Sequence, residues 1–331
     1  MLIQPVDPQD SHLLDRVVAL HTATDAVDCP WQEGLTARSL RVFLTRGWDD
    51  QPDQMVVGTL DGEVVAAGSV TLPARENVHT AWLGARVHPD RRRNGFGTRI
   101  YDHLERLAAD AGRSVFGTAG TDGAATRAFA ASREYPQRSM GVIRRVDLLA
   151  VPAEQVEQAY QDALSRAGGY ELVRVAGALS DDLLDAYVET VAAINDAPQD
   201  DMELEDEVHG PDRIRYYERT QELRGMRLYR VLVRYRQTGR IAGHTVVAVE
   251  GDRPHLAEQH DTTVVPTHRG HRLGLLVKAD MMRWLREAEP WLRSITTQNA
   301  ESNNHMIAVN DRLGYVTLGR VLFYQREVET S

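Results

Sequence analysis

The amino-acid sequence predicts a mixed α/β protein in which two similar domains follow one another. Three observations support this fold class. Segments with the periodicity of strands alternate with segments of helical periodicity along the chain. A basic, glycine-containing turn occurs twice, at the same place in each series. The 331 residues are also about the length of two domains. We therefore expect mixed sheets packed by helices on both faces.

The two turns stand at a constant separation. The first covers residues 87–97, Val-His-Pro-Asp-Arg-Arg-Arg-Asn-Gly-Phe-Gly, and the second covers residues 264–274, Val-Val-Pro-Thr-His-Arg-Gly-His-Arg-Leu-Gly. Pro89, Arg92 and Gly97 of the first turn have counterparts 177 residues later in the second. Gly62 and Gly239, each in a hairpin-like turn upstream, keep the same separation. Agreement over this distance indicates a duplicated domain.

The first half reads in order as strands and helices with recognisable boundaries. A helix is expected after Asp10 or Ser11, because both residue types cap helices and apolar residues follow at helical spacing. Gly62 marks a hairpin between two runs rich in valine. The expected strands are residues 2–5, 55–57, 64–66, 79–87, 114–118 and 141–151. The expected helices are residues 11–20, 37–46 and 124–133, and a helix after the first turn whose apolar face runs from Ile100 to Ala111.

The second half repeats this order. A helix at residues 152–167 begins at a proline and ends at Gly168 and Gly169, as helix boundaries do, and is interpreted as the linker. The expected strands that follow are residues 170–175, 228–233, 241–249, 255–265, 294–298 and 317–327. The expected helices are residues 181–195, 211–223, 271–288 and 302–312. The predicted domains are residues 1–151 and 169–331, joined by a helical linker at 152–168.

Composition excludes several classes of protein. The formal charge of −10 and a pI near 5.7 argue against nonspecific nucleic-acid binding, which needs a basic face. No stretch approaches the roughly 20 apolar residues that span a bilayer, and no signal peptide is visible, so we expect a cytoplasmic protein without a membrane partner. Cys29 is the only cysteine, which excludes internal disulfides and cysteine-rich metal clusters; no metal is expected. The sequence does not indicate an oligomeric state.

The chemistry of the two turns points to a phosphate ligand. Each turn leads from a strand into a helix, whose first amides are unpaired and carry the positive end of the helix dipole. Gly95 and Gly97 allow a phosphate to approach the main chain without a Cβ in the way. Positive charge is concentrated at both turns in an otherwise acidic chain, a pattern that suits a small anionic cofactor.

The pattern Val87-x-Pro89-x-x-Arg92-x-x-Gly95-x-Gly97 resembles the acetyl-CoA-binding motif of the GNAT superfamily of N-acetyltransferases. The resemblance implies two tandem GNAT-like domains, each a mixed, mostly antiparallel sheet flanked by helices, arranged as in mycothiol-synthase-like tandem members. It implies acetyl-CoA as donor, with its pyrophosphate on the amides of the turn. The residues implied in donor binding are Val87, Arg92, Arg93, Asn94, Gly95, Phe96, Gly97 and Thr98, and Val264, Val265, Arg269, Gly270, His271, Arg272, Leu273, Gly274 and Asn303.

The resemblance also implies a general base. Many members of this family use a Glu on the strand before the turn, eleven residues before the arginine of the motif. In the second half this position is Glu258, whereas in the first half it is Ala81. Because strand side chains alternate, Glu258 and His260 are expected on one face and Asp261 on the other. If the first pair faces the substrate, Glu258 is the base with His260 as helper; otherwise Asp261 is the fallback.

Two positions depart from the family pattern. Arg272 stands where the first turn has Gly95, so a large side chain occupies a place of close approach, although its charge could meet a phosphate. Near the C-terminus, Asn310 replaces the Tyr that often protonates the CoA thiolate, and Ala130 is at that position in the first half. Asn310 could donate a hydrogen bond to the sulfur or to pantetheine, but it cannot be an acid. With a thiol pKa of about 8.5, the thiolate could also leave unprotonated.

The expected function is therefore acetyl transfer from acetyl-CoA to a primary amine by direct attack, with the chemistry in the second domain. The acidic segment 200–207 could attract a cationic amine, or it could simply be a solvated charge run. The acceptor could be a metabolite amine, an aminoglycoside-like polyamine or a peptide. Two alternatives stay open: a non-catalytic CoA-binding regulator or scaffold, and catalysis in the first domain, whose turn is the more regular.

Overall fold

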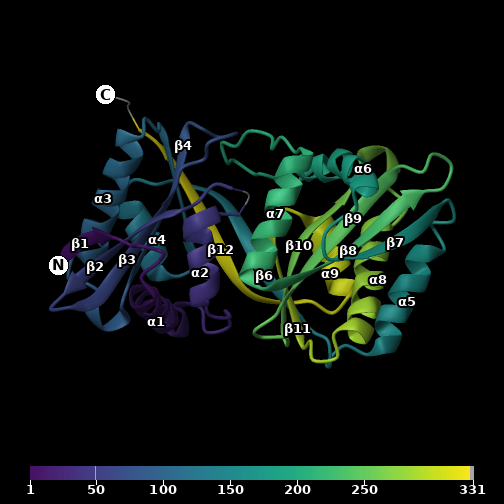
Figure 1. Ribbon diagram of the computed structural model, residues 1–331, viewed down its shortest axis with the longest axis horizontal. Coiled ribbons are helices and arrows are strands. Elements are labelled where there is room, and N and C mark those ends of the chain that lie inside the picture. The colour runs from purple at the N-terminus through teal and green to yellow at the C-terminus, as the bar shows by residue number, and fades with distance from the viewer. Residues whose placement is uncertain (49, 329–331) are drawn as a thin grey trace. The chain divides into compact units, whose positions relative to one another are not determined.

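The computed structural model describes residues 1–48 and 50–328 (Figure 1). The chain forms two compact units. Unit 1 contains residues 1–140, 200–205 and 319–331, and unit 2 contains residues 141–199 and 206–318. No helix among the described residues is long and apolar enough to cross a membrane.

Unit 1 has a six-stranded sheet with helices on both faces. Its strands lie in the order β1-β2-β3-β4-β5-β12. The pair β4 and β5 is parallel, and the other neighbouring strands of this series pair antiparallel. The strands are β1 (Leu2–Pro5), β2 (Gln54–Leu60), β3 (Glu63–Thr71), β4 (Thr80–Val87), β5 (Val115–Thr121) and β12 (Val316–Glu327). The helices are α1 (Ser11–Asp28), α2 (Ala37–Arg46), α3 (Phe96–Asp110) and α4 (Ala124–Ser132), with a short 3₁₀ turn at Pro89–Arg91.

Alternation along the strands of unit 1 supplies both of its hydrophobic cores. Ala66 of β3 packs with Ile100 and Leu104 of α3, whereas the next residue, Ala67, packs with Leu14 of α1 and its neighbours on the opposite face. Helices α1 and α2 therefore cover one face, and α3 covers the other. The first core also contains two residues of the C-terminal strand, Leu322 and Tyr324.

Unit 2 repeats this architecture. Its strands lie in the order β6-β11-β10-β9-β8-β7, and again one pair, β10 and β11, is parallel. The strands are β6 (Gln137–Asp147), β7 (Tyr170–Ala176), β8 (Met226–Tyr235), β9 (Ile241–Glu250), β10 (Leu256–Val264) and β11 (Ser294–Ala300). The helices are α5 (Ala153–Leu164), α6 (Asp181–Val191), α7 (Pro211–Arg224), α8 (Leu273–Ala288) and α9 (Asn304–Arg312), with 3₁₀ turns at Ala192–Asp196 and Pro266–His268.

The cores of unit 2 also lie on opposite faces of one sheet. Val231 of β8 packs in a large cluster with α5 and α8, whereas the adjacent Leu232 packs with α6 and α7. Val156 and Ala163 of α5 are fully buried in the first cluster. The helix interpreted from the sequence as a linker is thus a packed component of unit 2, as Figure 1 shows beside α8. The predicted fold class, sheets flanked by helices in tandem, is confirmed.

Two strands differ from the contiguous halves expected from the sequence. Strand β6 follows α4 in the first half, but its residues 141–147 pair with β11 in unit 2. Strand β12 ends the second half, but its residues 321–327 pair with β5 in unit 1. Each half therefore gives its last strand to the sheet of the other unit. The compact units consequently differ from residues 1–151 and 169–331, because the last strand of each repeat has the same pattern and fits either sheet edge.

This exchange makes the core of unit 1 depend on the C-terminal strand. We expect Leu322→Ala to destabilise the protein by about 2–5 kcal/mol, because the Leu322 side chain is fully buried and its loss leaves a cavity. The matched control is Val316→Ala on the same strand, which is 60% exposed and should change the free energy of unfolding by less than about 0.5 kcal/mol. Urea unfolding measures both; equal effects would contradict the assignment of Leu322 to this core.

Candidate active site

The two turns have the same backbone conformation, but glycine and arginine exchange positions between them. In the first turn Arg93 and Gly95 have positive φ angles of 64° and 76°. In the second turn the residues 177 positions later, Gly270 and Arg272, have φ angles of 84° and 57°. Each turn thus places one glycine and one arginine in the left-handed region. The second turn is therefore shaped like the first, despite lacking a glycine at position 272.

The arginine that the two turns share stabilises each loop. Arg92 donates from its Nε to the carbonyl of Val87 at 3.3 Å and from Nη2 to Asp28 at 2.6 Å. Arg269 repeats this arrangement with the carbonyl of Val264 at 3.0 Å and with Asp196 at 2.6 Å. Both carboxylates lie at the end of a helical segment of the same unit. These two arginines, expected to bind the donor, therefore hold the turn in shape.

The side chain of Arg272 points to α5. It forms an ion pair with Asp162, which also pairs with Arg312 of α9. These hydrogen bonds, led by that from Arg312, lower the pKa of Asp162. The expectation that Arg272 would stand in the place of close approach is therefore not matched by its side-chain direction. Its contribution to the turn is the left-handed backbone at the start of α8.

Both helices that follow the turns begin without a side-chain cap. The carbonyl of the N-cap residue Gly95 accepts from the amide of Arg99, and the carbonyl of the N-cap residue Arg272 accepts from the amide of Leu276. The amides of the residues between each pair therefore have no partner within the helix. A Cβ on Gly97 or on Gly274 would meet its nearest neighbour at 3.4 Å or 4.0 Å, which is ordinary contact. The surface over each helix start is therefore open to an anionic group.

The other expected donor-binding residues lie around the same turns. Val87 and Val264 end the strands β4 and β10, and Val265 precedes the 3₁₀ turn. Asn94 donates to the carbonyls of Arg91 and Arg92 at 3.1 Å each. Phe96 and Thr98 form the first turn of α3, and Leu273 is the buried first residue of α8. The His271 ring lies 5.5 Å from that of Tyr170. Asn303 caps α9 by accepting from the amide of Met306 at 3.1 Å.

The parallel strands of each unit separate shortly after they meet. In unit 2, β10 and β11 share only three register pairs, which end at Glu258 and Thr296. In unit 1, β4 and β5 share four, which end at Leu83 and Thr118. Beyond these points β10 pairs with β9 alone and β4 with β3 alone. The free backbone edge of the diverging strand is available to an extended ligand that ends at the turn.

Strand β10 contains a bulge that β4 lacks. The register between β10 and β9 shifts between Gln259 and Thr262, so His260 and Asp261 together face Val246. The side chain of Gln259 donates to the carbonyl of Val246 at 2.6 Å and thereby satisfies a group that the bulge has released. The pairing of β4 with β3 runs from Ala66 to Thr71 without a shift. The two units therefore differ at the middle of their central strand.

The bulge changes which residue of unit 1 corresponds to Glu258. Ala248 pairs with Glu258, and Thr71, 177 residues before Ala248, pairs with Trp82. Counting from the turn had predicted Ala81, because counting does not register the extra residue. The Trp82 indole lies over Gly117 of β5, where an added Cβ would come within 2.9 Å of the ring. Unit 1 thus has an aromatic ring in the place of the carboxylate.

The bulge also brings Asp261 to the same face as Glu258 and His260. Glu258 contacts Arg224 of α7, and His260 contacts Tyr217 of the same helix. The charge of Asp261 raises the pKa of Tyr187 on α6 and of Tyr217 on α7, in each case after the larger effect of burial. The expectation that Asp261 would point to the opposite face was wrong, because the extra residue interrupts the alternation.

Glu258 is held as a carboxylate by its neighbours. Burial favours the neutral form, but the hydrogen bond with His260 at 3.2 Å and the charge of Arg224 outweigh it and lower the pKa of Glu258 to about 2. Arg224 lies 3.2 Å from Oε1 and is itself buried. The Glu258 side chain remains 40% exposed. An ionised, anchored and accessible carboxylate binds an ammonium group well but is a weak base.

His260 connects Glu258 to Tyr217. The Tyr217 hydroxyl lies 2.5 Å from Nδ1 of His260, and Nε2 lies 3.2 Å from Glu258. Burial raises the pKa of Tyr217 well above its ordinary value, so the phenol keeps its proton. The two ring nitrogens of His260 therefore bridge the Tyr217 hydroxyl and the Glu258 carboxylate. His260 thus contacts Glu258, and its role as a helper stays a prediction.

Asp261 has the opposite electrostatic environment. Desolvation by the protein atoms around its carboxylate raises the pKa of Asp261. The charges of His260, His209 and Arg230 lower this pKa by smaller amounts. The residue is exposed to solvent. Two carboxylates on one face, one with a lowered and one with a raised pKa, form an arrangement suited to separate roles in binding and proton transfer.

A buried polar group beneath these carboxylates was not predicted. Arg230 of β8 is fully buried and lies 3.1 Å from Glu218 of α7. His244 of β9 is fully buried, and burial and the charge of Arg230 lower its pKa to about 3. Arg224, Tyr217 and these residues belong to helical and strand patterns that look amphipathic in the sequence. Only the packing of α7 on the sheet reveals them as neighbours of β10.

Asn310 lies in α9 with no exposed surface. Its Nδ2 donates to Asn299 of β11 at 2.9 Å, and its Oδ1 has no hydrogen-bond partner among the described residues. The donor that was expected to serve the sulfur or pantetheine is therefore engaged by Asn299. Asn310 holds α9 against β11 near the end of the parallel pairing.

Lys278 of α8 is a second group that the sequence did not predict. Its side chain is 2% exposed, and its Nζ lies 4.9 Å from the centroid of the Tyr315 ring. No carboxylate pairs with it in the part of the chain that the structure describes. Burial, and then the charge of Arg144, lower its pKa to about 7. The sequence gives little sign of this, because Lys278 follows four apolar residues in an ordinary helix pattern.

The acidic segment contributes much of its charge to local structure. Glu203 lies 3.1 Å from His79, and its backbone bonds to Gln325. Glu205 accepts from the amide of Asn77 at 2.5 Å. Residues 200–205 belong to unit 1, together with these partners. A cation-attracting role for the segment therefore rests on fewer free carboxylates than the sequence suggests.

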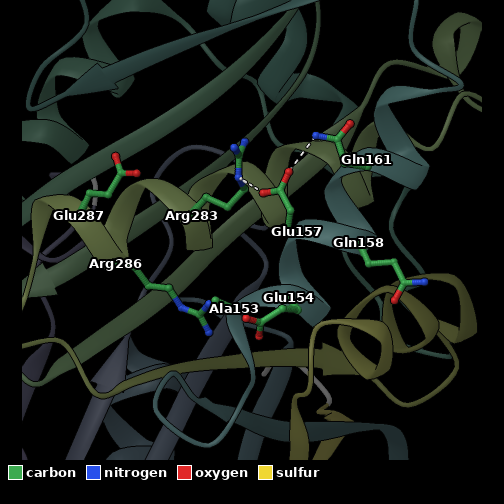
Figure 2. Close-up of a pocket in the computed structure, with 8 residues that line it drawn as sticks. All are labelled: Ala153, Glu154, Glu157, Gln158, Gln161, Arg283, Arg286 and Glu287. Atoms are coloured by element: carbon green, nitrogen blue, oxygen red, sulfur yellow. Dashed lines mark hydrogen bonds and ion pairs between the residues drawn. The ribbon is translucent and has the colours of Figure 1, made fainter.

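A hollow between α5 and α8 is also unrelated to the turn. Figure 2 shows Arg283 and Glu157 directed at one another inside it, 2.8 Å apart, and Gln161 donating to Glu157. Arg283 is ten residues beyond the start of α8, about 15 Å along the helix from the turn. This groove is filled by its own polar pairs and lies at the wrong end of α8 for a ligand of the turn.

Comparison with known proteins agrees with this geometry. Residues 20–135 match the model of the acetyltransferase (GNAT) family. The structure is similar to a tandem GNAT protein from the clavulanic acid biosynthesis pathway, with a TM-score of 0.80 and 26% sequence identity over 100% of this chain and 99% of that one. Part of the first half of the chain thus matches the GNAT acetyltransferase family, and the chain as a whole has the fold of a tandem GNAT protein.

Two further solved structures share this fold. A GCN5-related N-acetyltransferase from Sphaerobacter thermophilus has a TM-score of 0.70 at 14% identity, over 98% of this chain and 95% of that one. A glucosamine N-acetyltransferase region of a fungal multi-domain β-N-acetylglucosaminidase has a TM-score of 0.67 at 14% identity, over 98% of this chain and 38% of that one. A search of curated proteins finds no match. The resemblance inferred from the turns is confirmed.

The buried ammonium of Lys278 has a measurable consequence for stability. Because its pKa is about 7 in the folded chain and 10.5 in the unfolded chain, the unfolded state binds the extra proton between these values. The free energy of unfolding of the wild type therefore rises as the pH increases from 7 to 10.5. Below pH 7 the cost of burying the charged Lys278 side chain applies in full. We expect Lys278→Met to be more stable by roughly 2–5 kcal/mol at pH 6, with a smaller gain at pH 9.5. Urea unfolding at both pH values tests this; a gain independent of pH would contradict it.

Proposed function

We propose that the protein transfers the acetyl group of acetyl-CoA to a primary amine, and that the reaction takes place in unit 2. The observation that carries this proposal is the bulge in β10, which gathers Glu258, His260 and Asp261 on one face. Bulges commonly re-aim side chains at active sites. The corresponding strand of unit 1 has neither the bulge nor the carboxylate.

The donor is held by the second turn in this proposal. Its pyrophosphate lies against the amides at the start of α8, between Arg269 and Gly274. Its pantetheine arm follows the edge of β10 that is free beyond Glu258. An amide of the bulged segment then supplies a hydrogen bond to the thioester carbonyl, where negative charge develops during attack. The turn of unit 1 has the same backbone and offers a second place for a CoA molecule.

Glu258 binds the acceptor amine, and Asp261 accepts its proton. Glu258 stays ionised and presents an acceptor to the ammonium, while Arg224 and His260 fix its orientation. An unperturbed alkyl ammonium has a pKa near 10.4, so a proton must leave before attack. Asp261, whose pKa is raised, is the stronger base of the two. The neutral amine attacks the carbonyl carbon, and the thiolate of CoA departs.

A matched pair of variants tests which turn serves the reaction. Gly97→Asp and Gly274→Asp each place a carboxylate over a helix start, where it repels a pyrophosphate but fits the available space. We expect Gly274→Asp to abolish acceptor-dependent release of CoA thiol from acetyl-CoA, because the donor can no longer bind in unit 2. Gly97→Asp should retain turnover. A panel of small and peptide amines serves as acceptors.

The reverse result identifies the alternatives. Loss of turnover in Gly97→Asp alone would assign the reaction to unit 1. Tight CoA binding with no thiol release for any amine would favour the non-catalytic CoA-binding regulator. Circular dichroism of both variants confirms that they are folded, since an acidic residue in the first turn of a helix is favourable.

The two carboxylates should differ in their kinetic effects. We expect Glu258→Gln to raise the KM of the amine by about tenfold or more, since it removes a charge-assisted hydrogen bond. Asp261→Asn should lower kcat by about 10²-fold, because the base is lost. In the wild type, kcat should fall as the pH drops through the raised pKa of Asp261, and this limb should be missing in Asp261→Asn. Steady-state kinetics between pH 4.5 and 9 measure both. Identical profiles for the wild type and Asp261→Asn would contradict the assigned role.

A further inference from the structure

Lys278 occupies a site that the proposed reaction has not used. It projects from the second turn of α8, on the face of the sheet opposite to Glu258 and Asp261. Tyr315, whose ring it contacts, directly follows α9 and donates its backbone amide to the carbonyl of Asn310. Arg144, whose charge acts on Lys278, stands opposite Thr297 in the pairing of β6 with β11.

These contacts place the ammonium beneath the separation of β10 and β11. Thr297 is the first residue of β11 beyond the last parallel pair, which is formed by Glu258 and Thr296. Asn299 of the same strand bonds to Asn310. Lys278, Asn310 and Tyr315 therefore surround the segment of β11 that borders the opening strand edge. A thioester that follows this edge has its sulfur over the α8 and α9 side.

We propose that Lys278 is the general acid of the acetyl transfer, donating a proton from its Nζ to the sulfur of the departing CoA. This inference rests on the proposed function in unit 2. Asn310, which occupies the place of the acid in the family pattern, has no acidic proton and is bound to Asn299. Lys278 is the nearby group that can supply one.

The step balances without another reactant. The amine nitrogen forms a bond to the carbonyl carbon and the carbon–sulfur bond breaks, so that sulfur takes the electron pair. Sulfur then receives the proton of Lys278, which becomes a neutral amine. The proton lost earlier by the substrate ammonium returns to Lys278 through solvent before the next cycle. A pKa of about 7 for Lys278, against about 8.5 for a thiol, makes the transfer favourable.

No neighbouring carboxylate among the described residues forms an ion pair with the Lys278 ammonium. Tyr315 is buried and its pKa is raised above 10, so it stays neutral. Arg144 of β6 is paired with Asp311 of α9. Several other charged groups on α8 and on the elements packed near it form pairs of their own: Arg174 with Asp280, Arg283 with Glu157, and Arg312 with Asp162. Arg286 of α8 donates to the backbone carbonyls of Leu148 and Val151. Glu258, Asp261 and His244 lie toward the opposite face. A buried ammonium that nothing neutralises is costly to keep, which is consistent with a functional role.

The test compares the binding of CoA with that of desulfo-CoA by calorimetry at pH 8. All proteins carry Gly97→Asp, so that calorimetry measures ligand binding at the second turn alone. We expect CoA to bind about tenfold more tightly than desulfo-CoA when Lys278 is present, because the Lys278 Nζ forms a hydrogen bond with the thiol. Lys278→Met should bind the two ligands equally. Its kcat should fall by about 10²-fold, and the loss of wild-type rate as the pH rises through 7 should disappear.

Two further variants control the experiment. Tyr101→Phe changes the residue at the same place in unit 1, 177 positions earlier, and should alter neither the binding ratio nor kcat. Lys278→Arg keeps the positive charge but cannot release a proton near neutral pH, so it should retain the preference for CoA and lose the decline of rate above pH 7. It also replaces Lys278→Met if that variant does not fold.

An unchanged binding ratio and pH profile in folded Lys278→Met would overturn the role of Lys278. That outcome is distinct from failure of the proposed function, in which CoA does not bind when the first turn is blocked or Gly274→Asp keeps full turnover.

Discussion

The extra residue in β10 is the constraint on which the site depends. A strand that alternates regularly would place Glu258 and Asp261 on opposite faces, with one of them in the core beside α8. The bulge at His260 and Asp261 avoids this, and Gln259 stabilises it by bonding to the released carbonyl of Val246. Two carboxylates then share a face with a buried network from α7, which gives them different proton affinities.

The same bulge is the main difference between the two duplicated units. The phosphate turns kept their backbone shape, with arginine and glycine exchanged between the two left-handed positions. The arginine braces were also kept, through Asp28 in one unit and Asp196 in the other. The central strands diverged: β4 is regular and covers its neighbour with Trp82, whereas β10 is bulged and carries carboxylates. The turns are thus alike in the two units, whereas the central strands are not.

Much of the fold follows from the sequence, and less of the site. Helices and strands were predictable because apolar periodicity and residues such as Asp10 and Pro152 mark where they begin. The exchange of β6 and β12 was not, since either strand satisfies either sheet edge. Glu258 was found by motif spacing, but its counterpart was misassigned because a bulge leaves no mark in the sequence. Arg224, Tyr217 and Lys278 were missed because each sits in a helical pattern whose burial depends on tertiary packing.

The most direct measurement is a crystal structure of the protein with acetyl-CoA. The account predicts that the pyrophosphate lies on the amides between Arg269 and Gly274 and that the thioester carbonyl accepts a hydrogen bond from the bulged segment of β10, with Asp261 and Glu258 on the acceptor side. A donor bound only at Gly95 and Gly97, or one whose thioester in unit 2 lies away from the bulge, would contradict it.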